Sequence, residues 1–200
     1  MHFSLLACAG FASAWAANLV NFPFEATQLE KEDINGFPAI GFGDNSAVSM
    51  RRDRPRCKAF PGTDDWPTAH EWSRLNDSMN GVLLKPIPAA SACYDGVGHN
   101  STQCDFLLTG ASETRFYTDD PLTVLTQWPQ GDTCLAAMDA HGNCTQGGFP
   151  VYVANVTTVR DIQAAVNFAR NMNVRLVIKY VLGLEACLAL SNICQHGVLD

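Results

Sequence analysis

The sequence predicts an α+β fold, in which a disulfide-containing N-terminal region is followed by an incomplete β-α-β unit. Residues 150–179 contain two short β-rich runs on either side of a segment with helical periodicity. Five of the cysteines lie between Cys57 and Cys144, upstream of or at the start of that unit. From Tyr180 onward the chain changes character and supplies no glycine-rich turn. The sequence therefore predicts the start of a β-α-β unit but not the glycine-rich turn that would follow its second strand.

The β-α-β prediction rests on residue spacing. The run Val151–Val153 follows Pro150 and suits a buried strand. Thr158 can cap a helix, with Asp161 three residues later to meet the exposed amides. Helical spacing predicts one packed face, formed by Val159, Ile162, Val166 and Ala169. A mostly solvated face is expected from Arg160, Gln163, Asn167 and Arg170.

A second strand is predicted at Val174–Lys179, parallel to the first. Two such strands form a sheet with two unpaired edges. Without a third strand its apolar faces are left to residues 180–200, which would cover them only by accident. We therefore expect residues 155–200 to be the least protected part of the chain.

Upstream, Trp66-Pro67 opens a predicted helix that runs through Ser78, with Trp72, Leu75 and Met79 on one face.

Several strings together resemble a known family. The string YVANVTTVRDIQAAVNFARNMNVRLVIK is similar to the opening of the FAD-binding domain of vanillyl-alcohol-oxidase-type flavoproteins, in particular the secreted fungal berberine-bridge-enzyme-like oxidoreductases. Upstream, CKAFPGTDDWPTAHEWSRLNDSMNGVL, the cysteines Cys93 and Cys104, and CLAAMDAHGNCTQGGFPVYV resemble the N-terminal region of that group. The resemblance covers about Cys57 to Lys179, which makes the chain similar to an N-terminal fragment of such an enzyme.

The resemblance implies the start of a PCMH-type FAD-binding domain. It also implies flavin-dependent oxidation of a small organic substrate, with O2 as acceptor and FAD as cofactor. In the family, the strand matching Arg175–Lys179 runs into a loop that holds the FAD pyrophosphate and carries a flavin-bonding histidine. Nothing from Tyr180 onward matches that loop, so His196 is not given this role.

Lys179 remains the one cofactor-binding candidate, and a plain sheet-edge lysine is the alternative. No catalytic or metal-binding residue is assigned. We expect this chain, as written, to be inactive and not to retain FAD. The alternative function is a non-catalytic, secreted, disulfide-bonded glycoprotein fragment. A retained intron, a true truncation and a gene-model error all remain open as origins of residues 180–200.

The predicted organisation has five parts. Residues 1–17 are a signal peptide, 18–56 an extended leader, 57–149 the cysteine-containing region, 150–179 the truncated FAD-domain start and 180–200 a tail outside the family pattern. A buried N-terminal helix is the alternative for the first part. The net charge of -7 and a pI of about 5.1 argue against nucleic acid as a partner, and no segment is long and apolar enough to predict membrane insertion.

The cysteines and sequons indicate a secreted protein. Removing Cys8 with the signal peptide leaves seven of the eight cysteines. Cys93 with Cys104 and Cys134 with Cys144 are candidate disulfides, which leaves Cys57 without an assigned partner. A zinc site at Cys134, His141 and Cys144 fits no common finger spacing, so a disulfide is favoured. The glycosylation candidates are Asn76, Asn100, Asn143 and Asn155, of which Asn76 and Asn100 are preferred.

We expect the chain to enter the secretory pathway, to lose Met1 with its leader, and to carry glycan at Asn76 or Asn100. Treatment of the exported protein with an endoglycosidase should increase its gel mobility, and N-terminal sequencing should begin after the small-residue run at Ala16 and Ala17. Unchanged mobility argues against the glycan, and an exported chain that still begins at Met1 argues against cleavage.

Overall fold

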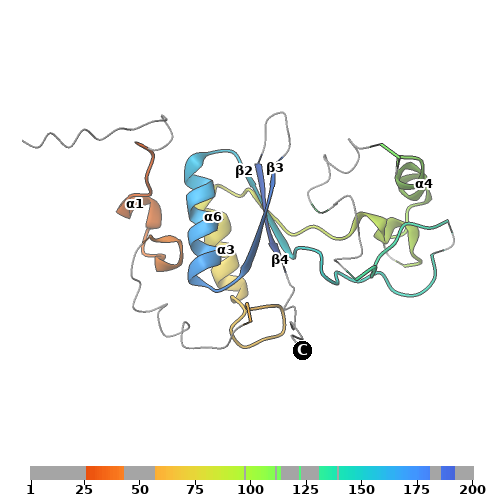
Figure 1. The fold of residues 1–200 in the computed structure, drawn as a ribbon, viewed down its shortest axis with the longest axis horizontal. Helices are drawn as coiled ribbons and strands as arrows, with labels where there is room; N and C mark the ends of the chain where they lie inside the picture. Colours follow the sequence, from red (N-terminus) through yellow and green to blue (C-terminus); the bar gives the residue numbers. More distant parts are fainter. Residues whose placement is uncertain are drawn as a thin grey trace, which may run out of the picture.

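The computed structural model describes residues 26–42, 57–96, 98–110, 112–113, 122, 131–138, 140–180 and 186–191, with backbone alone at residue 180 and at 186–191. Its helices are α1 (Lys31–Ile34), α3 (Ala69–Ser78), α4 (Ser101–Gly110) and α6 (Val159–Asn171), with 3-10 turns η2 (Pro38–Ile40) and η3 (Ala89–Cys93). Its strands are β1 (Leu83–Leu84), β2 (Tyr152–Val156), β3 (Arg175–Tyr180) and β4 (Ala186–Ser191). The fold is mixed α+β, and α3 and α6 lie side by side against the sheet (Figure 1).

The sheet has four strands in the order β1-β2-β4-β3. β4 is antiparallel to both β2 and β3, so these two parallel strands do not pair with each other. The predicted two-stranded parallel sheet is therefore wrong, because the segment Ala186–Ser191 supplies a strand between its members. The register places Val156 and Tyr180 on either side of Ala186, and Tyr152 and Leu176 on either side of Leu190.

Helix α6 begins where the sequence predicts. Thr158 and Asp161 form a capping box, in which each side chain accepts a hydrogen bond from the other residue's backbone amide. The predicted packed face is only partly correct, since Ile162 is 38% exposed while Ala169 is buried. The apolar buried positions are Ala164, Ala165, Phe168 and Ala169. Asn167, predicted to be solvated, is also buried, because another segment covers that side of the helix.

That segment is residues 26–42, here named the N-terminal strap. The sequence predicts an extended leader here, whereas the strap contains α1 and η2 and buries Phe37 and Ile40 in the main core. Figure 1 shows it beside α6, on the side away from the sheet. Phe37 packs 6.1 Å, centroid to centroid, from Phe168. The hydrophobic residues of the strap thus stabilise it against α6.

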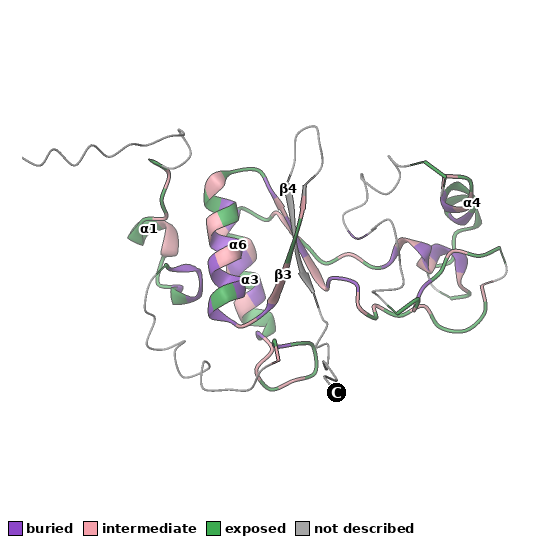
Figure 2. Cartoon of the chain, in the orientation of Figure 1, coloured by how far each residue is buried: buried purple, intermediate pink, exposed green. Residues whose placement is uncertain are grey.

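Helix α3 supplies the other wall of the core. It begins at Ala69 after a Thr68–Glu71 capping box, and the predicted residues Trp72, Leu75 and Met79 are all buried. The Trp72 ring stacks on Tyr152 of β2, with centroids 4.0 Å apart. Figure 2 shows buried positions on the facing sides of α3 and α6. An aromatic cluster therefore joins both helices to the sheet.

The region between β1 and β2 has its own small core. Both candidate cysteine pairs are disulfides, Cys93–Cys104 and Cys134–Cys144. The first packs with Leu107 of α4, a helix that the sequence analysis did not predict. α4 has a weak amphipathic pattern and begins after Asn100, whose side-chain oxygen accepts from the amide of Gln103.

Among the described residues, no helix has the length and apolar character needed to cross a bilayer.

The Phe168→Ala variant should lose about 3–5 kcal/mol of unfolding free energy, because a fully buried ring at the centre of the core is replaced by a cavity. Urea denaturation measures this loss. Ile87→Ala is the control, and since Ile87 is 69% exposed it should change stability by about 0.5 kcal/mol or less. Equal losses in the two variants would contradict the assigned core.

Candidate functional site

Ligands of open α/β sheets bind outside the carboxyl ends of the parallel strands. In this chain β2 ends at Val156 and β3 at Tyr180, and both residues lie opposite Ala186 of β4. The N-terminus of α6 opens directly from β2 at the same edge. We name residues 156–161 with Lys179 and Tyr180 the carboxyl edge, and it is the candidate site. Residues 181–185, which connect β3 to β4, lie outside the described part.

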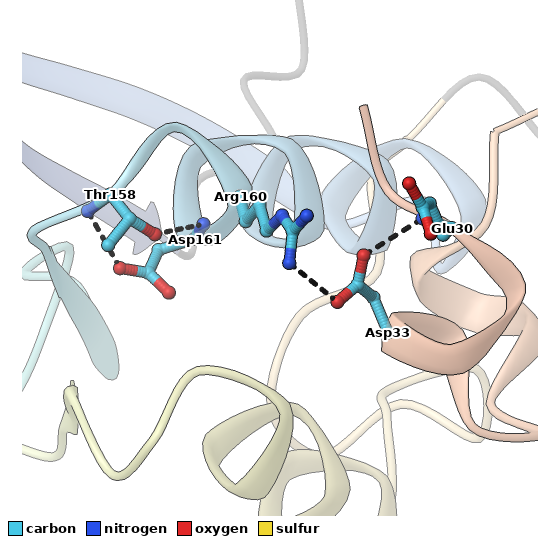
Figure 3. A network of polar contacts seen from close by, with 5 residues as sticks. All are labelled: Glu30, Asp33, Thr158, Arg160 and Asp161. Carbon is cyan, nitrogen blue, oxygen red and sulfur yellow. Dashed lines mark hydrogen bonds and ion pairs between the residues drawn. The ribbon is translucent and has the colours of Figure 1, made fainter. Parts of the chain in front are cut away.

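The N-terminus of α6 uses its own side chains as hydrogen-bond partners. The Asp161 carboxylate accepts from the Thr158 amide at 2.9 Å and from the Thr157 amide at 3.2 Å. The Thr158 hydroxyl accepts from the Asp161 amide at 3.2 Å (Figure 3). Asp161 is only 4% exposed. The capping box therefore satisfies the amide of Asp161 and the amides just before the helix, and it places a buried carboxylate at the helix terminus, where an anion would bind.

This arrangement does not fit a dinucleotide pyrophosphate at the α6 terminus. A pyrophosphate there would lie beside the buried negative charge of Asp161. Lys179, the sequence-predicted cofactor residue, lies one position before the end of β3. It is half-buried and stands opposite Cys187, whose other neighbour across the sheet is Asn155. Lys179 thus belongs to the same edge but not to the Thr158–Asp161 network.

A second polar network holds the strap on α6. The Asn171 amide donates to the carbonyls of Ala39 and Gly41, each at 2.9 Å, and the Asn167 amide donates to the Ile40 carbonyl at 3.0 Å. The two asparagines lie four residues apart, so they share one face of the helix. We name this set of contacts the asparagine clamp.

Further polar contacts extend the same attachment along α6. Gln163 donates to the Thr27 carbonyl at 2.6 Å, and the Arg170 guanidinium donates twice to the Asn171 side-chain oxygen. Arg160 forms an ion pair with Asp33 at 3.1 Å (Figure 3). The sequence signal for this surface was the spacing of Gln163, Asn167 and Asn171, three amides at helical intervals.

The strap and α6 enclose a surface pocket of about 320 Å³. Its lining is neutral and consists of Gln28, Leu29, Phe42, Ile162, Gln163, Val166 and Asn167. The side-chain oxygen of Gln163 is buried and has no hydrogen-bond partner among the described residues. The Arg170 guanidinium lies 5.1 Å from the centre of the Phe42 ring at the pocket rim. The pocket offers apolar contact and amide hydrogen bonding.

At the opposite end of β2, Tyr152 combines an apolar stack with a titratable hydroxyl. Trp72 covers its ring, and the Lys85 ammonium lies 5.8 Å from the ring centre. Burial raises the pKa of the Tyr152 phenol above its ordinary value. The phenol therefore stays protonated at neutral pH.

The sequence-predicted modification sites differ in exposure. Asn100 and Asn143 are exposed, whereas Asn76 and Asn155 are half-buried. The Asn76 side-chain oxygen accepts from the Leu83 amide at 3.0 Å, and Asn155 lies within β2. No cluster of metal-ligating side chains occurs among the described residues.

Cys57, to which the sequence analysis assigned no partner, has one. It is bonded in a disulfide, and its carbonyl accepts from the Asn173 amide group at 3.1 Å. The leader residues before 26, with Cys8, and the tail residue His196 lie outside the described residues.

Comparison with known proteins identifies relatives. The VAO-type flavoprotein oxidase VAO615 of Thermothelomyces thermophilus is 36% identical over 128 residues, which is 62% of this chain and 22% of the relative. The FAD-linked oxidoreductase apf9 of Gibberella fujikuroi is 37% identical over 124 residues, 62% of this chain and 21% of the relative. No family profile matches the chain.

A solved structure shows the same relationship. The crystal structure of the VAO-type flavoprotein MtVAO615 from Myceliophthora thermophila superposes with a TM-score of 0.55 and 34% identity, over 60% of this chain and 22% of that one. The chain is a homologue of the fungal VAO-type, FAD-linked oxidoreductases. It spans about a fifth of the length of the curated relatives that it matches.

The Asn171→Ala variant should lose about 2–3 kcal/mol of unfolding free energy, because it leaves two carbonyls of the strap without their donor in a buried site. It should also speed tryptic cleavage at Lys31 within the strap. Arg160→Ala, which removes an ion pair whose arginine is 52% exposed, should cost about 1 kcal/mol or less. Urea denaturation and timed proteolysis compare the two variants, and a larger effect of Arg160→Ala would contradict the clamp.

Proposed function

We propose that this chain forms the N-terminal module of an FAD-linked oxidoreductase. The observation that carries the proposal is the match to flavoprotein oxidases over more than half of the chain, at 36% identity and with a similar fold. In this proposal, β2, α6 and β3 are the opening β-α-β unit of a PCMH-type FAD-binding domain. FAD supplies the redox chemistry of the complete enzyme, taking hydride from a small organic substrate and passing electrons to O2.

We further propose that these 200 residues by themselves neither retain FAD nor oxidise a substrate. Two features of the carboxyl edge support this. The Asp161 carboxylate is held at the α6 terminus by the Thr157 and Thr158 amides, so a phosphate would meet a carboxylate there. β4 pairs with β2 and β3 up to their ends, at Val156 and Tyr180. Lys179 is the residue from which we expect any remaining contact with an anionic cofactor.

The competing proposal is a non-catalytic, secreted, disulfide-bonded glycoprotein. The pairing of β4 with both neighbouring strands favours it, because residues beyond the family-like region complete the sheet. In either proposal the protein is extracellular, with glycan at one or more of its sequons, and has neither nucleic acid nor membrane as a partner. A small-molecule substrate belongs to the oxidoreductase proposal alone.

The test is flavin retention by the purified 200-residue chain, expressed with excess FAD. We expect no visible flavin absorbance and no FAD in the supernatant after heat denaturation, because the α6 terminus is already capped. The flavoprotein oxidase VAO615, purified in parallel, is the positive control for flavin retention. Stoichiometric flavin in this chain would overturn the proposal that it is inactive. Loss of that flavin in a Lys179→Ala variant would then assign the cofactor role to Lys179.

A further inference from the structure

The chain contains two Asn-Gly pairs, Asn35-Gly36 and Asn80-Gly81. This dipeptide is among the most reactive asparagine sequences in proteins, because glycine has no side chain to hinder attack by its own amide nitrogen on the preceding side-chain amide. Both asparagines are exposed, and both have φ in the left-handed region, at 44° and 56°. The two pairs differ in how the glycine amide is held.

The second pair is fixed to the end of α3. The Gly81 amide donates to the Asn76 carbonyl at 2.9 Å, and the Asn76 side-chain oxygen accepts from the Leu83 amide at 3.0 Å. The residue just before this pair, Met79, is fully buried in the main core. The nitrogen that would attack Asn80 is therefore engaged in a hydrogen bond within a turn anchored at both ends.

The first pair lies at the end of α1 in the strap. α1 has only four residues, and none of them is fully buried. Within the described part of the chain, neither the Gly36 amide nor the Asn35 side chain makes a hydrogen bond. The ψ angle of 48° at Asn35 turns the Gly36 nitrogen away from the side-chain amide, so attack requires the turn to open. A single helical turn opens at little cost in free energy.

We propose that Asn35 is a site of spontaneous deamidation, that isoaspartate is the main product, and that this product loosens the strap. In the first step the Gly36 nitrogen loses its proton and bonds to the Asn35 side-chain carbon. The bond from that carbon to its amide nitrogen breaks, and ammonia leaves with the proton. Water then opens the resulting succinimide at either of its two carbonyls. Opening at the main-chain carbonyl gives isoaspartate, and opening at the side-chain carbonyl gives aspartate.

Arg74 favours the isoaspartyl product. Its guanidinium donates to the Asn35 carbonyl at 3.0 Å and to the Gly36 carbonyl at 3.4 Å. In isoaspartate the first of these carbonyls becomes a carboxylate. A guanidinium binds a carboxylate more strongly than it binds a neutral carbonyl, so the existing contact becomes an ion pair.

The same product disturbs the packing that follows it. Isoaspartate adds one carbon to the main chain between α1 and Phe37. The Phe37 ring packs against Phe168 and lies 4.6 Å from the Arg74 guanidinium. Because closely packed aromatic contacts tolerate little displacement, the longer main chain weakens the attachment of the strap to the helices.

Peptide mapping of the purified chain during incubation at mildly alkaline pH tests the proposal. Trypsin releases Asn35 and Asn80 on separate peptides, and fragmentation distinguishes Asn35 from Asn45 on the first of them. Glycosidase is left out, since it converts asparagine to aspartate. We expect deamidation at Asn35 while Asn80 remains intact, and labelling by protein isoaspartyl methyltransferase should locate isoaspartate at residue 35. An intact Asn35, or Asn80 reacting at least as fast, overturns the proposal.

Two controls separate the effect of the fold from that of the dipeptide. In denaturant both pairs should react at similar rates, and a persistent preference for Asn35 there would contradict the structural explanation. Asn171→Ala, which weakens the asparagine clamp, should speed the reaction at Asn35 several-fold, whereas Ile87→Ala should leave it unchanged. An unchanged rate in Asn171→Ala would contradict reaction through opening of the strap.

The effect on the strap has its own measurement. The isoaspartyl form carries one more negative charge than the unmodified chain, so ion exchange separates the two. We expect trypsin to cut the isoaspartyl form several-fold faster at Lys31. Equal cleavage rates in the two forms would overturn the claim that the modification loosens the strap.

Discussion

The hydrogen bonds between β4 and its two neighbours hold the sheet together. β2 and β3 are parallel, lie two positions apart and make no ladder with each other, so each depends on β4. The helices then bury one face of the assembled sheet, where Trp72 packs against both Phe168 and Tyr152. The pairing of β4 with β2 and β3 therefore completes a four-stranded sheet, which is more stable in water than an isolated pair of strands.

The strap depends on a different kind of interaction. Asn167 and Asn171 donate to main-chain carbonyls in a buried site, where an unpaired carbonyl is costly. The Arg160–Asp33 ion pair lies nearer to solvent and contributes little by comparison. The buried hydrogen bonds from these two asparagines therefore fix the position of the strap on α6. Phe37 and Ile40 add apolar contacts with the main core.

Local sequence patterns predicted which helices and strands form better than they predicted which of these elements contact one another. The Thr158–Asp161 capping box, the α3 residues Trp72 and Leu75, and the α+β class were all evident in the sequence, since each reflects short-range spacing. The burial of Asn167 was not evident, because a segment more than a hundred residues away covers it. The position of β4 was missed for the same reason. Strand order is set by long-range pairing, and the segment Ala186–Ser191 contains no β-branched residue, so its composition does not indicate a strand.

The candidate site also illustrates why a β-α-β pattern alone does not define a cofactor site. A helix N-terminus can bind an anion only where its amides remain available. In α6 the Thr158–Asp161 capping box engages the amides of Thr158 and Asp161, and it is also the strongest sequence signal for the helix. The residues that make the helix recognisable therefore also place a buried carboxylate at its terminus, where it opposes the binding of a phosphate.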